Sequence, residues 1–374
     1  METLTEDFIK KNIPLLGFGF MRLPTLSSLE EVNHNEVQKM VDRCMESGVN
    51  YFDTAYIYHG GNSEIAVKET IAKKYPREKY FVVDKLPAWE METEADNSRI
   101  FNDQLKKCGV EYFDFYMLHA LDEEKYEKHL KLGSFEFCKK MKEEGKIRFL
   151  GFSFHGTAKD LRRILTERPD MEFVQLQINY IDWFTGEEQE FYNIAREFNK
   201  PIIVMEPVRG GYLANLPNHV EKILKDYNKD ASIASWAMRF CGSLDGVFNV
   251  LSGMSTMEHI DDNINSLYPF TPLSKEEWQV LEQAAKALSK IDTVPCTLCK
   301  YCDKCPQEIP IFDIFEMYNK YLDNKHFASF KAKYDKIDKQ DNVSVCTLCG
   351  QCIRVCPQSI DIPTRLKEAE EIVG

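Results

Sequence analysis

Short apolar runs alternate with longer amphipathic or charged segments from residue 15 to about residue 255. Each apolar run is bounded by polar or turn residues, a pattern that is typical of β-strands buried on both faces of a sheet. The pattern predicts eight strands, at Leu15–Gly19, Tyr51–Thr54, Tyr80–Lys85, Phe113–His119, Arg148–Ser153, Phe173–Asn179, Pro201–Glu206 and Val247–Gly253.

The segments between these runs have the composition and spacing of helices. The predicted helices are Asn35–Glu46, Ser63–Lys74, Asn97–Cys108, Ser134–Glu144, Glu187–Phe198 and Ala231–Phe240. Gly48, Gly109 and Gly145 follow three of them closely, where a residue in the left-handed conformation ends a helix most easily. Strand and helix units that repeat eight times, roughly every 30 residues, predict an α/β fold whose parallel sheet closes into a (β/α)8 barrel.

An open doubly wound sheet is the alternative arrangement for such a chain. It is disfavoured by the number of strands and because no Gly-x-Gly-x-x-Gly turn follows an early strand. A chain of 374 residues is longer than one ordinary domain and suits a large domain followed by a small one. We therefore expect a barrel domain over residues 1–290 and a smaller, mostly helical domain over residues 291–374.

The composition, 44% hydrophobic and 29% charged with a formal net charge of -13, is that of a soluble globular chain. The acidic excess argues against nucleic acids and anionic membranes as partners, because both attract a basic surface. No run approaches the ~20 apolar residues of a transmembrane helix. The first residues, METLTEDFIKKN, lack the apolar core of a signal peptide. We expect a cytoplasmic protein.

Polar side chains gather at the carboxyl ends of three consecutive predicted strands. Asp53 and Tyr58 follow the second strand, Lys85 ends the third and His119 ends the fourth. In a parallel barrel this end of the strands carries the chemistry. Any one of the four residues could be a solvated rim residue or a satisfied core histidine. Four titratable groups at one end of three neighbouring strands instead indicate a catalytic site.

These segments resemble the active site of the aldo-keto reductase superfamily, and the likeness covers roughly residues 12–290. Seven motifs occur in the family's order: FDTAYIY (52–58), VVDKLP (82–87), FDFYMLHAL (113–121), GKIRFLGFSFHG (145–156), FVQLQINY (173–180), MEPVRGG (205–211) and LSGMSTMEHIDDN (251–263). The resemblance implies an oxidoreductase that interconverts a carbonyl compound and an alcohol with NAD or NADP.

The chemistry of the four residues agrees with that activity. Hydride addition leaves negative charge on the carbonyl oxygen, so a proton donor must lie within hydrogen-bond reach of it. Tyr58 can donate that proton if its pKa falls from about 10 towards neutrality, and a nearby Lys85 ammonium favours the phenolate. We expect Asp53 to orient Lys85 and His119 to bond the substrate oxygen. A nicotinamide cofactor would supply the hydride.

By the same resemblance, the cofactor contacts are Ser153, Gln175, Met205, Glu206, Val208, Arg209, Gly210, Gly253, His259 and Asn263. Ser153 and Gln175 would bond the nicotinamide carboxamide. Phe154 stands where the family often has an asparagine, and Met205 stands where many members stack a tyrosine on the ring. Arg209 is a suitable pyrophosphate partner.

The segment Gly253–Asn263 decides between the two nicotinamides. NADP-preferring relatives carry cations here for the 2′-phosphate, whereas this chain has His259, Asp261 and Asp262 and no Arg or Lys. A dianionic phosphate among two aspartates is poorly stabilised. The sequence therefore favours NAD slightly, with the alternative that Arg209 or a residue from the C-terminal tail supplies the missing charge.

Eight of the twelve cysteines form two tight groups after residue 295. Clustered cysteines in a cytosolic chain indicate metal ligation rather than disulfides. The four isolated cysteines are expected to be small buried hydrophobic residues. They are Cys44, Cys108, Cys138 and Cys241.

The second group has the two-two-three spacing of a bacterial ferredoxin, in which the fourth cysteine ligates the other [4Fe–4S] cluster. The first group has only two residues between neighbours throughout. The ferredoxin crossing predicts that Cys296, Cys299, Cys302 and Cys356 hold one cluster and Cys305, Cys346, Cys349 and Cys352 the other. A zinc ribbon is the alternative, but three cysteines at this spacing do not easily reach one tetrahedral zinc. The aromatic run Phe312–Tyr334 between the groups is expected to form core against the barrel.

Two classes of function fit these features. The first is an aldo-keto reductase with a ferredoxin-like tail, acting on a small carbonyl or alcohol substrate in an apolar pocket of Phe20, Met21, Phe154, Trp183 and Phe184. The second is an electron-transfer or redox-sensing protein whose barrel is a binding module; the complete set of four polar residues favours the first. The clusters are structural, or exchange electrons with a separate ferredoxin or flavoprotein. A hydride carries two electrons while each cluster accepts one, and the chain has no recognisable flavin motif.

Overall fold

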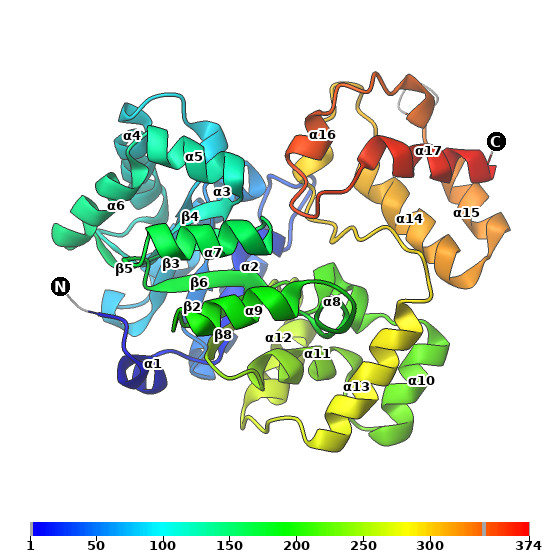
Figure 1. Cartoon of the computed structure of the whole chain (residues 1–374), viewed down its shortest axis with the longest axis horizontal. Coiled ribbons are helices and arrows are strands. Elements are labelled where there is room, and N and C mark those ends of the chain that lie inside the picture. Colours follow the sequence, from blue (N-terminus) through cyan, green and yellow to red (C-terminus); the bar gives the residue numbers. More distant parts are fainter. Residues whose placement is uncertain (1–2, 339–341, 374) are drawn as a thin grey trace. The chain divides into compact units, whose positions relative to one another are not determined.

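Eight parallel strands form a closed barrel in which each strand pairs with the next and β8 pairs with β1 (Figure 1). The computed structural model describes residues 3–338 and 342–373. The strands are β1 (Leu16–Gly19), β2 (Tyr51–Asp53), β3 (Phe81–Leu86), β4 (Phe113–Leu121), β5 (Ile147–Phe154), β6 (Phe173–Gln177), β7 (Ile202–Met205) and β8 (Val247–Ser252). The predicted (β/α)8 barrel is confirmed, and the open sheet is excluded.

The chain divides into two compact units. The first comprises Met1–Pro207 and Ala234–Trp278 and contains the whole barrel; the second comprises Val208–Ile233 and Gln279–Gly374. The second unit therefore combines the cysteine-rich tail with the segment that directly follows β7. The sequence boundary at residue 290 remains a prediction.

Helices follow the strands as expected. The α-helices up to β8 are α1 (Glu6–Asn12), α2 (His34–Glu46), α3 (Asn62–Val67), α4 (Ala95–Cys108), α5 (Glu123–Lys131), α6 (Ser134–Glu143), α7 (Ala158–Glu167), α8 (Tyr180–Thr185), α9 (Glu188–Glu197), α10 (Asn218–Tyr227) and α11 (Ile233–Gly242). Those after β8 are α12 (Met257–Leu267), α13 (Lys275–Leu288), α14 (Ile311–Asn324), α15 (Phe327–Tyr334), α16 (Gln351–Arg354) and α17 (Ile362–Val373). No helix in the described ranges is long and apolar enough to cross a membrane.

Short helical turns complete the framework. They are η1 (Phe20–Arg22), η2 (Tyr58–Gly61), the π-helical η3 (Lys68–Ala72), η4 (Arg77–Lys79), η5 (Ala88–Glu90), η6 (Arg209–Ala214), η7 (Tyr301–Asp303) and η8 (Val343–Val345). The helix predicted over Ser63–Lys74 is thus split into α3 and η3. The four isolated cysteines are fully buried, as predicted.

Alternation along the strands directs alternate side chains into the barrel. Val83 of β3 and Phe115 of β4 are register partners and belong to one buried cluster, so Lys85, two residues after Val83, faces inward as well. Phe8 of α1 packs on Phe149 with ring centroids 5.0 Å apart. Apolar rings therefore fill the amino-terminal part of the barrel, and polar inward positions begin at the level of Lys85.

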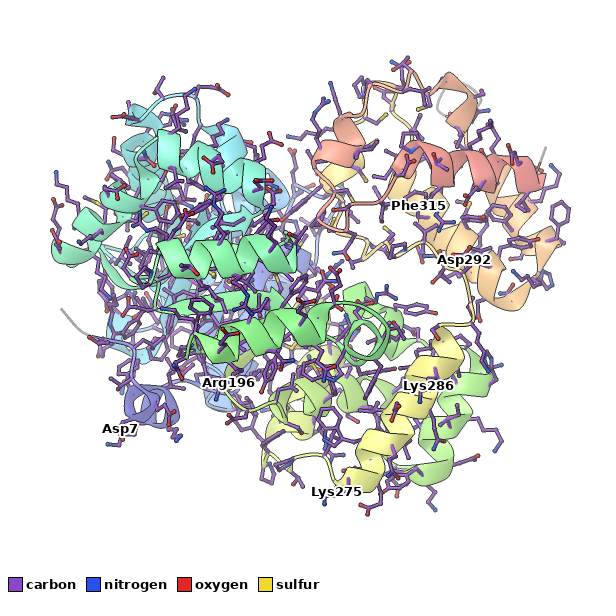
Figure 2. All side chains as sticks on the ribbon, viewed as in Figure 1. Asp7, Arg196, Lys275, Lys286, Asp292 and Phe315 are labelled. Atoms are coloured by element: carbon purple, nitrogen blue, oxygen red, sulfur yellow. The ribbon has the colours of Figure 1, made fainter. Side chains whose placement is uncertain are left out.

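The second unit has its own hydrophobic core. Phe315 of α14 (Figure 2) is 1% exposed and shares this core with Phe330 and Tyr334 of α15 and Leu366 of α17. Six of its cysteines and the side chain of Tyr321 pack against the same cluster. The aromatic run predicted to cover the barrel therefore packs into the core of the tail itself, because α14, α15 and α17 bury it together.

Candidate active site and metal centres

A buried ion pair lies at the inner end of the predicted site. Lys85 Nζ is 2.5 Å from Asp53 Oδ1 and donates a second hydrogen bond to the carbonyl oxygen of Thr54 at 2.7 Å. Both residues are 1% exposed. Burial raises the pKa of Asp53 and the adjacent ammonium opposes this rise. Buried charges are tolerated when they are paired and hydrogen-bonded, which holds here for the ammonium of Lys85.

Tyr58 is the first residue of η2, five positions after the end of β2, and is 8% exposed. The turn is tight because His59, Gly60 and Gly61 all have positive φ, a conformation that glycine adopts without steric cost. Lys85 Nζ lies 5.0 Å from the centroid of the Tyr58 ring. The His119 ring lies 6.1 Å from the same ring at an interplanar angle of 81°. The structure thus brings together all four residues predicted from the strand ends.

His119 of β4 is 4% exposed. Burial, reinforced by the Lys85 charge, lowers the pKa of His119 well below its usual value. The imidazole is therefore neutral near pH 7, and one ring nitrogen carries a hydrogen. Within the described residues its Nδ1 has no hydrogen-bond partner.

Trp89 of η5 also belongs to this site, and the sequence analysis did not identify it. Its ring centroid is 5.0 Å from that of His119. Trp89 could have been predicted as a site residue because it lies four positions after Lys85, in the loop at the carboxyl end of β3. Of the residues predicted to form the apolar pocket, Phe20 and Phe154 are buried, whereas Met21, Trp183 and Phe184 are partly exposed. Phe20 packs edge-on against Phe18, and Trp183 packs edge-on against Phe240.

A second group that the sequence analysis missed lies on the opposite side of β3. Asp84 Oδ1 accepts hydrogen bonds from the Lys85 backbone N–H and from Gln104 Nε2, both at 2.8 Å. Glu64 of α3 interacts with Asp84, and both carboxyls are completely buried. Burial raises the pKa of Glu64 to about 7 and that of Asp84 well above its usual value. The position of Asp84 could have been predicted from the alternation of the strand. A residue next to the inward-facing Lys85 must face the surrounding helices.

Three predicted cofactor residues follow one another around the barrel. Ser153 of β5 and Gln175 of β6 are register partners. Ser153 Oγ accepts a hydrogen bond from the Ala120 backbone N–H at 2.7 Å. Gln175 Nε2 lies 3.3 Å from Met205 Sδ, whereas its Oε1 has no partner in the part of the chain that the structure describes. The three side chains thus form a strip across three neighbouring strands, β5, β6 and β7.

Glu206, just after β7, forms an ion pair with Arg22 in the loop after β1. It has a left-handed backbone (φ 56°), and its Oε1 lies 3.1 Å from Arg22 Nη2. The Arg22 carbonyl accepts a hydrogen bond from Ser255 Oγ at 2.7 Å, and Gly253 packs against the Arg22 side chain. An ion pair therefore connects the loops after β1 and β7, and the loop after β8 is bonded to it.

The predicted adenosine segment begins with the residues after β8 and continues into α12. His259 Nδ1 accepts a hydrogen bond from the Ser255 backbone N–H at 3.2 Å. Asn263 is 5% exposed, and its Nδ2 donates to Ser252 Oγ at 2.8 Å. Arg43 of α2 lies 2.7 Å from Asp261. The structure thus adds a cation to a segment that has none in its own sequence.

Val208, Arg209 and Gly210 belong to the second unit, at the start of η6. Arg209 and Gly210 have φ of 48° and 65°, and Gly211 continues this left-handed run with 95°. Consecutive backbone units in unusual conformations can point their N–H groups in one direction and bind an anion. The sequence RGG permits this conformation because two of its three residues are glycines.

Seven of the eight clustered cysteines have neighbours from the set that the ferredoxin crossing predicts for them. Besides burial, the neighbouring thiols that raise the pKa of Cys302 are Cys299, Cys296 and Cys356. Those that raise the pKa of Cys352 are Cys305 and Cys346. Each set thus contains a cysteine from the other sequence group.

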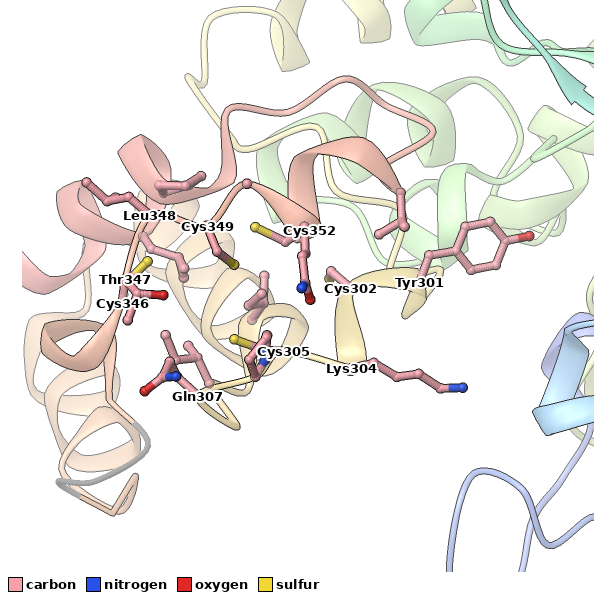
Figure 3. A pocket seen from close by; sticks show the side chains of 18 residues that line it. Tyr301, Cys302, Lys304, Cys305, Gln307, Cys346, Thr347, Leu348, Cys349 and Cys352 are labelled. Atoms are coloured by element: carbon pink, nitrogen blue, oxygen red, sulfur yellow. The ribbon is translucent and has the colours of Figure 1, made fainter. Parts of the chain in front are cut away.

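A cavity of about 170 Å³ lies at the second set and includes Cys302 of the first (Figure 3). Its apolar walls include Ile309, Ile311 and Leu366. Cys349 is exposed and the other seven clustered cysteines are partly buried. The described residues contain no group of three His, Cys, Asp or Glu side chains placed to hold a single metal ion. Four thiols with apolar walls suit a ferredoxin-type [4Fe–4S] cluster, which is held by four cysteine thiolates.

Comparisons with known proteins agree with both parts of the chain. The model of the aldo/keto reductase family matches residues 15–286, and the model of the 4Fe-4S dicluster domain matches residues 295–361. Probable aldo-keto reductase 1 of Glycine max is 27% identical over 205 residues, which are 53% of this chain and 56% of that protein. The uncharacterized oxidoreductase YqkF of Bacillus subtilis is 21% identical over 311 residues, 74% of this chain and 94% of that protein.

Solved structures show the same barrel. The holo form of aldo-keto reductase AKR11C1 from Bacillus halodurans superposes with a TM-score of 0.60 at 23% identity, covering 73% of this chain and 92% of that one. An aldo-keto reductase from Klebsiella pneumoniae in complex with NADPH gives a TM-score of 0.60 at 19% identity, covering 76% and 95%. At these identities the likeness establishes the fold.

Proposed function

The chain belongs to the aldo/keto reductase family and carries a 4Fe-4S domain after the barrel, and we propose that this oxidoreductase interconverts carbonyl compounds and alcohols with NAD(P)H. The observation that carries the proposal is the buried Lys85–Asp53 pair beside Tyr58, with the His119 ring 6.1 Å from the tyrosine ring. A buried cation next to a phenol is unusual in a packed core and suits proton transfer.

Each of the four residues has a separate role in the proposed reaction. A bound NAD(P)H supplies the hydride. Tyr58 gives its phenolic proton to the developing alkoxide, and the Lys85 ammonium stabilises the phenolate that remains. Asp53 keeps Lys85 charged and oriented. His119, neutral because it is buried, donates one N–H to the carbonyl oxygen and polarises it.

The strip of Ser153, Gln175 and Met205 suits the nicotinamide end of the cofactor. The buried Gln175 Oε1 can accept from the carboxamide NH2. Ser153 Oγ already accepts from Ala120, so its hydroxyl hydrogen can be donated to the carboxamide oxygen. The thioether of Met205 can cover the ring. Val208, Arg209 and Gly210 are proposed to hold the pyrophosphate, and Glu206, Gly253, His259 and Asn263 to contact the remaining parts of the dinucleotide.

We favour NAD over NADP because the nearby cations are already paired. Arg22 is bound to Glu206 and Arg43 to Asp261. A 2′-phosphate would have to displace a carboxylate from one of them, whereas a ribose hydroxyl would not.

The tail is proposed to bind two [4Fe–4S] clusters with the crossed ligand sets. The sorting of the thiols around Cys302 and Cys352 supports this assignment. The clusters stabilise the tail or exchange electrons with a separate ferredoxin or flavoprotein. The alternative function, an electron carrier or sensor that uses the barrel for binding, would not require the proton donor Tyr58.

The Tyr58→Phe variant tests the proposal. Carbonyl reduction should fall by a factor of about 100 or more, because the proton donor is lost, while NADH binding measured by fluorescence titration stays close to wild type. The matched control is Tyr227→Phe, which changes an exposed tyrosine on α10. A Tyr58→Phe enzyme with half the wild-type turnover and an unchanged pH profile would remove this residue from the mechanism.

A further inference from the structure

The loop proposed to hold the pyrophosphate packs against the first cysteine loop, within the second unit. At Gly210 an added Cβ would lie 2.1 Å from the Thr297 carbonyl oxygen and 2.6 Å from its carbonyl carbon. These are backbone atoms and cannot turn aside as a flexible side chain can. Gly211, the next residue, also has a positive φ, but a Cβ there would meet nothing within 4 Å. At Gly210 a side chain is therefore excluded by contact with the Thr297 backbone. At Gly211 it is disfavoured only by the backbone conformation.

A second contact joins the same two segments. The side chain of Tyr212, in η6, is hydrogen-bonded to Thr293. The tail segment is in turn anchored to α14, because Asn319 accepts from the Val294 N–H and donates to the Val294 carbonyl, both at 2.8 Å. Thr297 is only 2% exposed. Residues 293–297 are thus held between η6 on one side and α14 on the other.

Thr297 lies between two proposed cluster ligands, Cys296 and Cys299. The Leu298 backbone N–H points to Cys296 Sγ at 3.4 Å, and Leu298 and Lys300 both have left-handed backbones. A loop that directs backbone N–H groups at a cysteine sulfur is the arrangement that surrounds an iron–sulfur cluster. Any change of this loop on losing its cluster would move the Thr297 backbone, which is in contact with Gly210.

We infer that the first cysteine loop (residues 296–299) is a supporting part of the dinucleotide site: it holds the RGG loop (residues 209–211) in position through the Gly210–Thr297 contact. Cluster binding and dinucleotide binding are then coupled, and each strengthens the other by the same factor, as linkage requires. The inference rests on the proposed function, in which Arg209 and Gly210 contact the pyrophosphate. In this proposal Thr297 is a positioning residue that acts through its contact with Gly210.

The holoprotein, prepared anaerobically as Gly210→Ala and Gly211→Ala variants, tests the contact. Gly210→Ala should displace the Thr297 backbone, so it should alter the electron paramagnetic resonance spectrum of the dithionite-reduced clusters and weaken NADH binding by about tenfold or more. Gly211→Ala introduces a similar backbone strain without the clash, so its cluster spectrum should match wild type whatever its NADH affinity. A Gly210→Ala protein with wild-type spectrum and iron content would overturn the inference.

Variants of the cysteines test the effect of cluster binding on dinucleotide binding. Cys299→Ser should lower NADH affinity by about tenfold, and Cys349→Ser, in the other proposed ligand set, should change it far less. If Gly210→Ala does not fold, Tyr212→Phe tests the contact between the same two segments. Removing the hydrogen bond between Tyr212 and Thr293 should change the cluster spectrum and the NADH affinity in the same directions, but by less. Equal NADH affinity in Cys299→Ser and wild type would overturn the coupling. A wild-type chain that binds neither NADH nor NADPH would instead overturn the proposed function.

Discussion

Asp53 Oδ1 and Lys85 Nζ lie 2.5 Å apart, and each of the two residues is 1% exposed. Asp53 ends β2 and Lys85 lies in β3, so the pairing of these strands holds the two charges together. The ammonium has a second acceptor, the Thr54 carbonyl, whereas Asp53 Oδ2 has no partner among the described residues. Removing Lys85 would therefore leave the buried Asp53 carboxyl without its cation partner.

Lys85→Met should destabilise the protein by about 3–5 kcal/mol, because it leaves the Asp53 carboxylate buried without its cation. Adding Asp53→Asn removes that charge, so the double variant should regain part of the unfolding free energy in urea denaturation while carbonyl reduction stays lost. A Lys85→Met protein as stable as wild type would show that the pair does not stabilise the fold.

Glu64→Gln should change the pH dependence of stability. In the folded protein the pKa of Glu64 is raised from 4.5 to about 7 by burial, so the folded state keeps a proton that the unfolded state loses. The unfolding free energy should therefore fall as pH rises from 4.5 to about 7, and Glu64→Gln should lessen this fall in denaturation curves recorded across that range. Glu143→Gln, at an exposed position on α6, is the control. Equal slopes for Glu64→Gln and wild type would contradict the prediction.

His129→Leu should make the protein less sensitive to acid. His129 is completely buried, and burial lowers its pKa to about 3. Below pH 6.5 His129 binds a proton in the unfolded state but stays neutral in the folded state. The free energy of unfolding therefore falls as pH falls, by up to about 1.4 kcal/mol per pH unit. Removing the imidazole should reduce that slope between pH 6.5 and 4. The exposed His219, changed to Gln, is the control; a slope unchanged in His129→Leu would count against a neutral buried imidazole.

NADH should bind more tightly than NADPH, because Arg22 and Arg43 are already paired with carboxylates. His259→Arg places an unpaired cation on the adenosine segment and should shift the ratio of the two dissociation constants towards NADPH by about tenfold, or 1.4 kcal/mol. Fluorescence titration measures both constants. A wild-type preference of about tenfold for NADPH would refute the argument.

Cys356→Ser should remove the cluster shared with Cys296, Cys299 and Cys302, so iron should fall from about eight to about four atoms per chain. Cys138→Ala removes an isolated buried cysteine and should leave the iron content unchanged. Iron and sulfide analysis of anaerobically purified protein measures this. Full iron content in Cys356→Ser would exclude the crossed ligand set.

The barrel and its four central polar residues could be predicted from the sequence alone. Strands buried on both faces are continuous apolar runs, so their number and order could be predicted from the pattern. Asp53, Tyr58, Lys85 and His119 could be grouped because parallel strands present their carboxyl ends at one face. The spacing of the cysteines likewise predicted a 4Fe-4S tail.

Only the tertiary structure revealed the partners that hold this site. Arg22 and Glu206 are 184 residues apart in the chain, and Arg43 and Asp261 are 218 apart. Gly210 and Thr297 meet through their backbones, and Glu64 interacts with Asp84 from a different element. Such pairs depend on the paths of loops and on how helices pack against the barrel. Periodicity describes which face a residue occupies, but it contains no information on which distant segment covers that face.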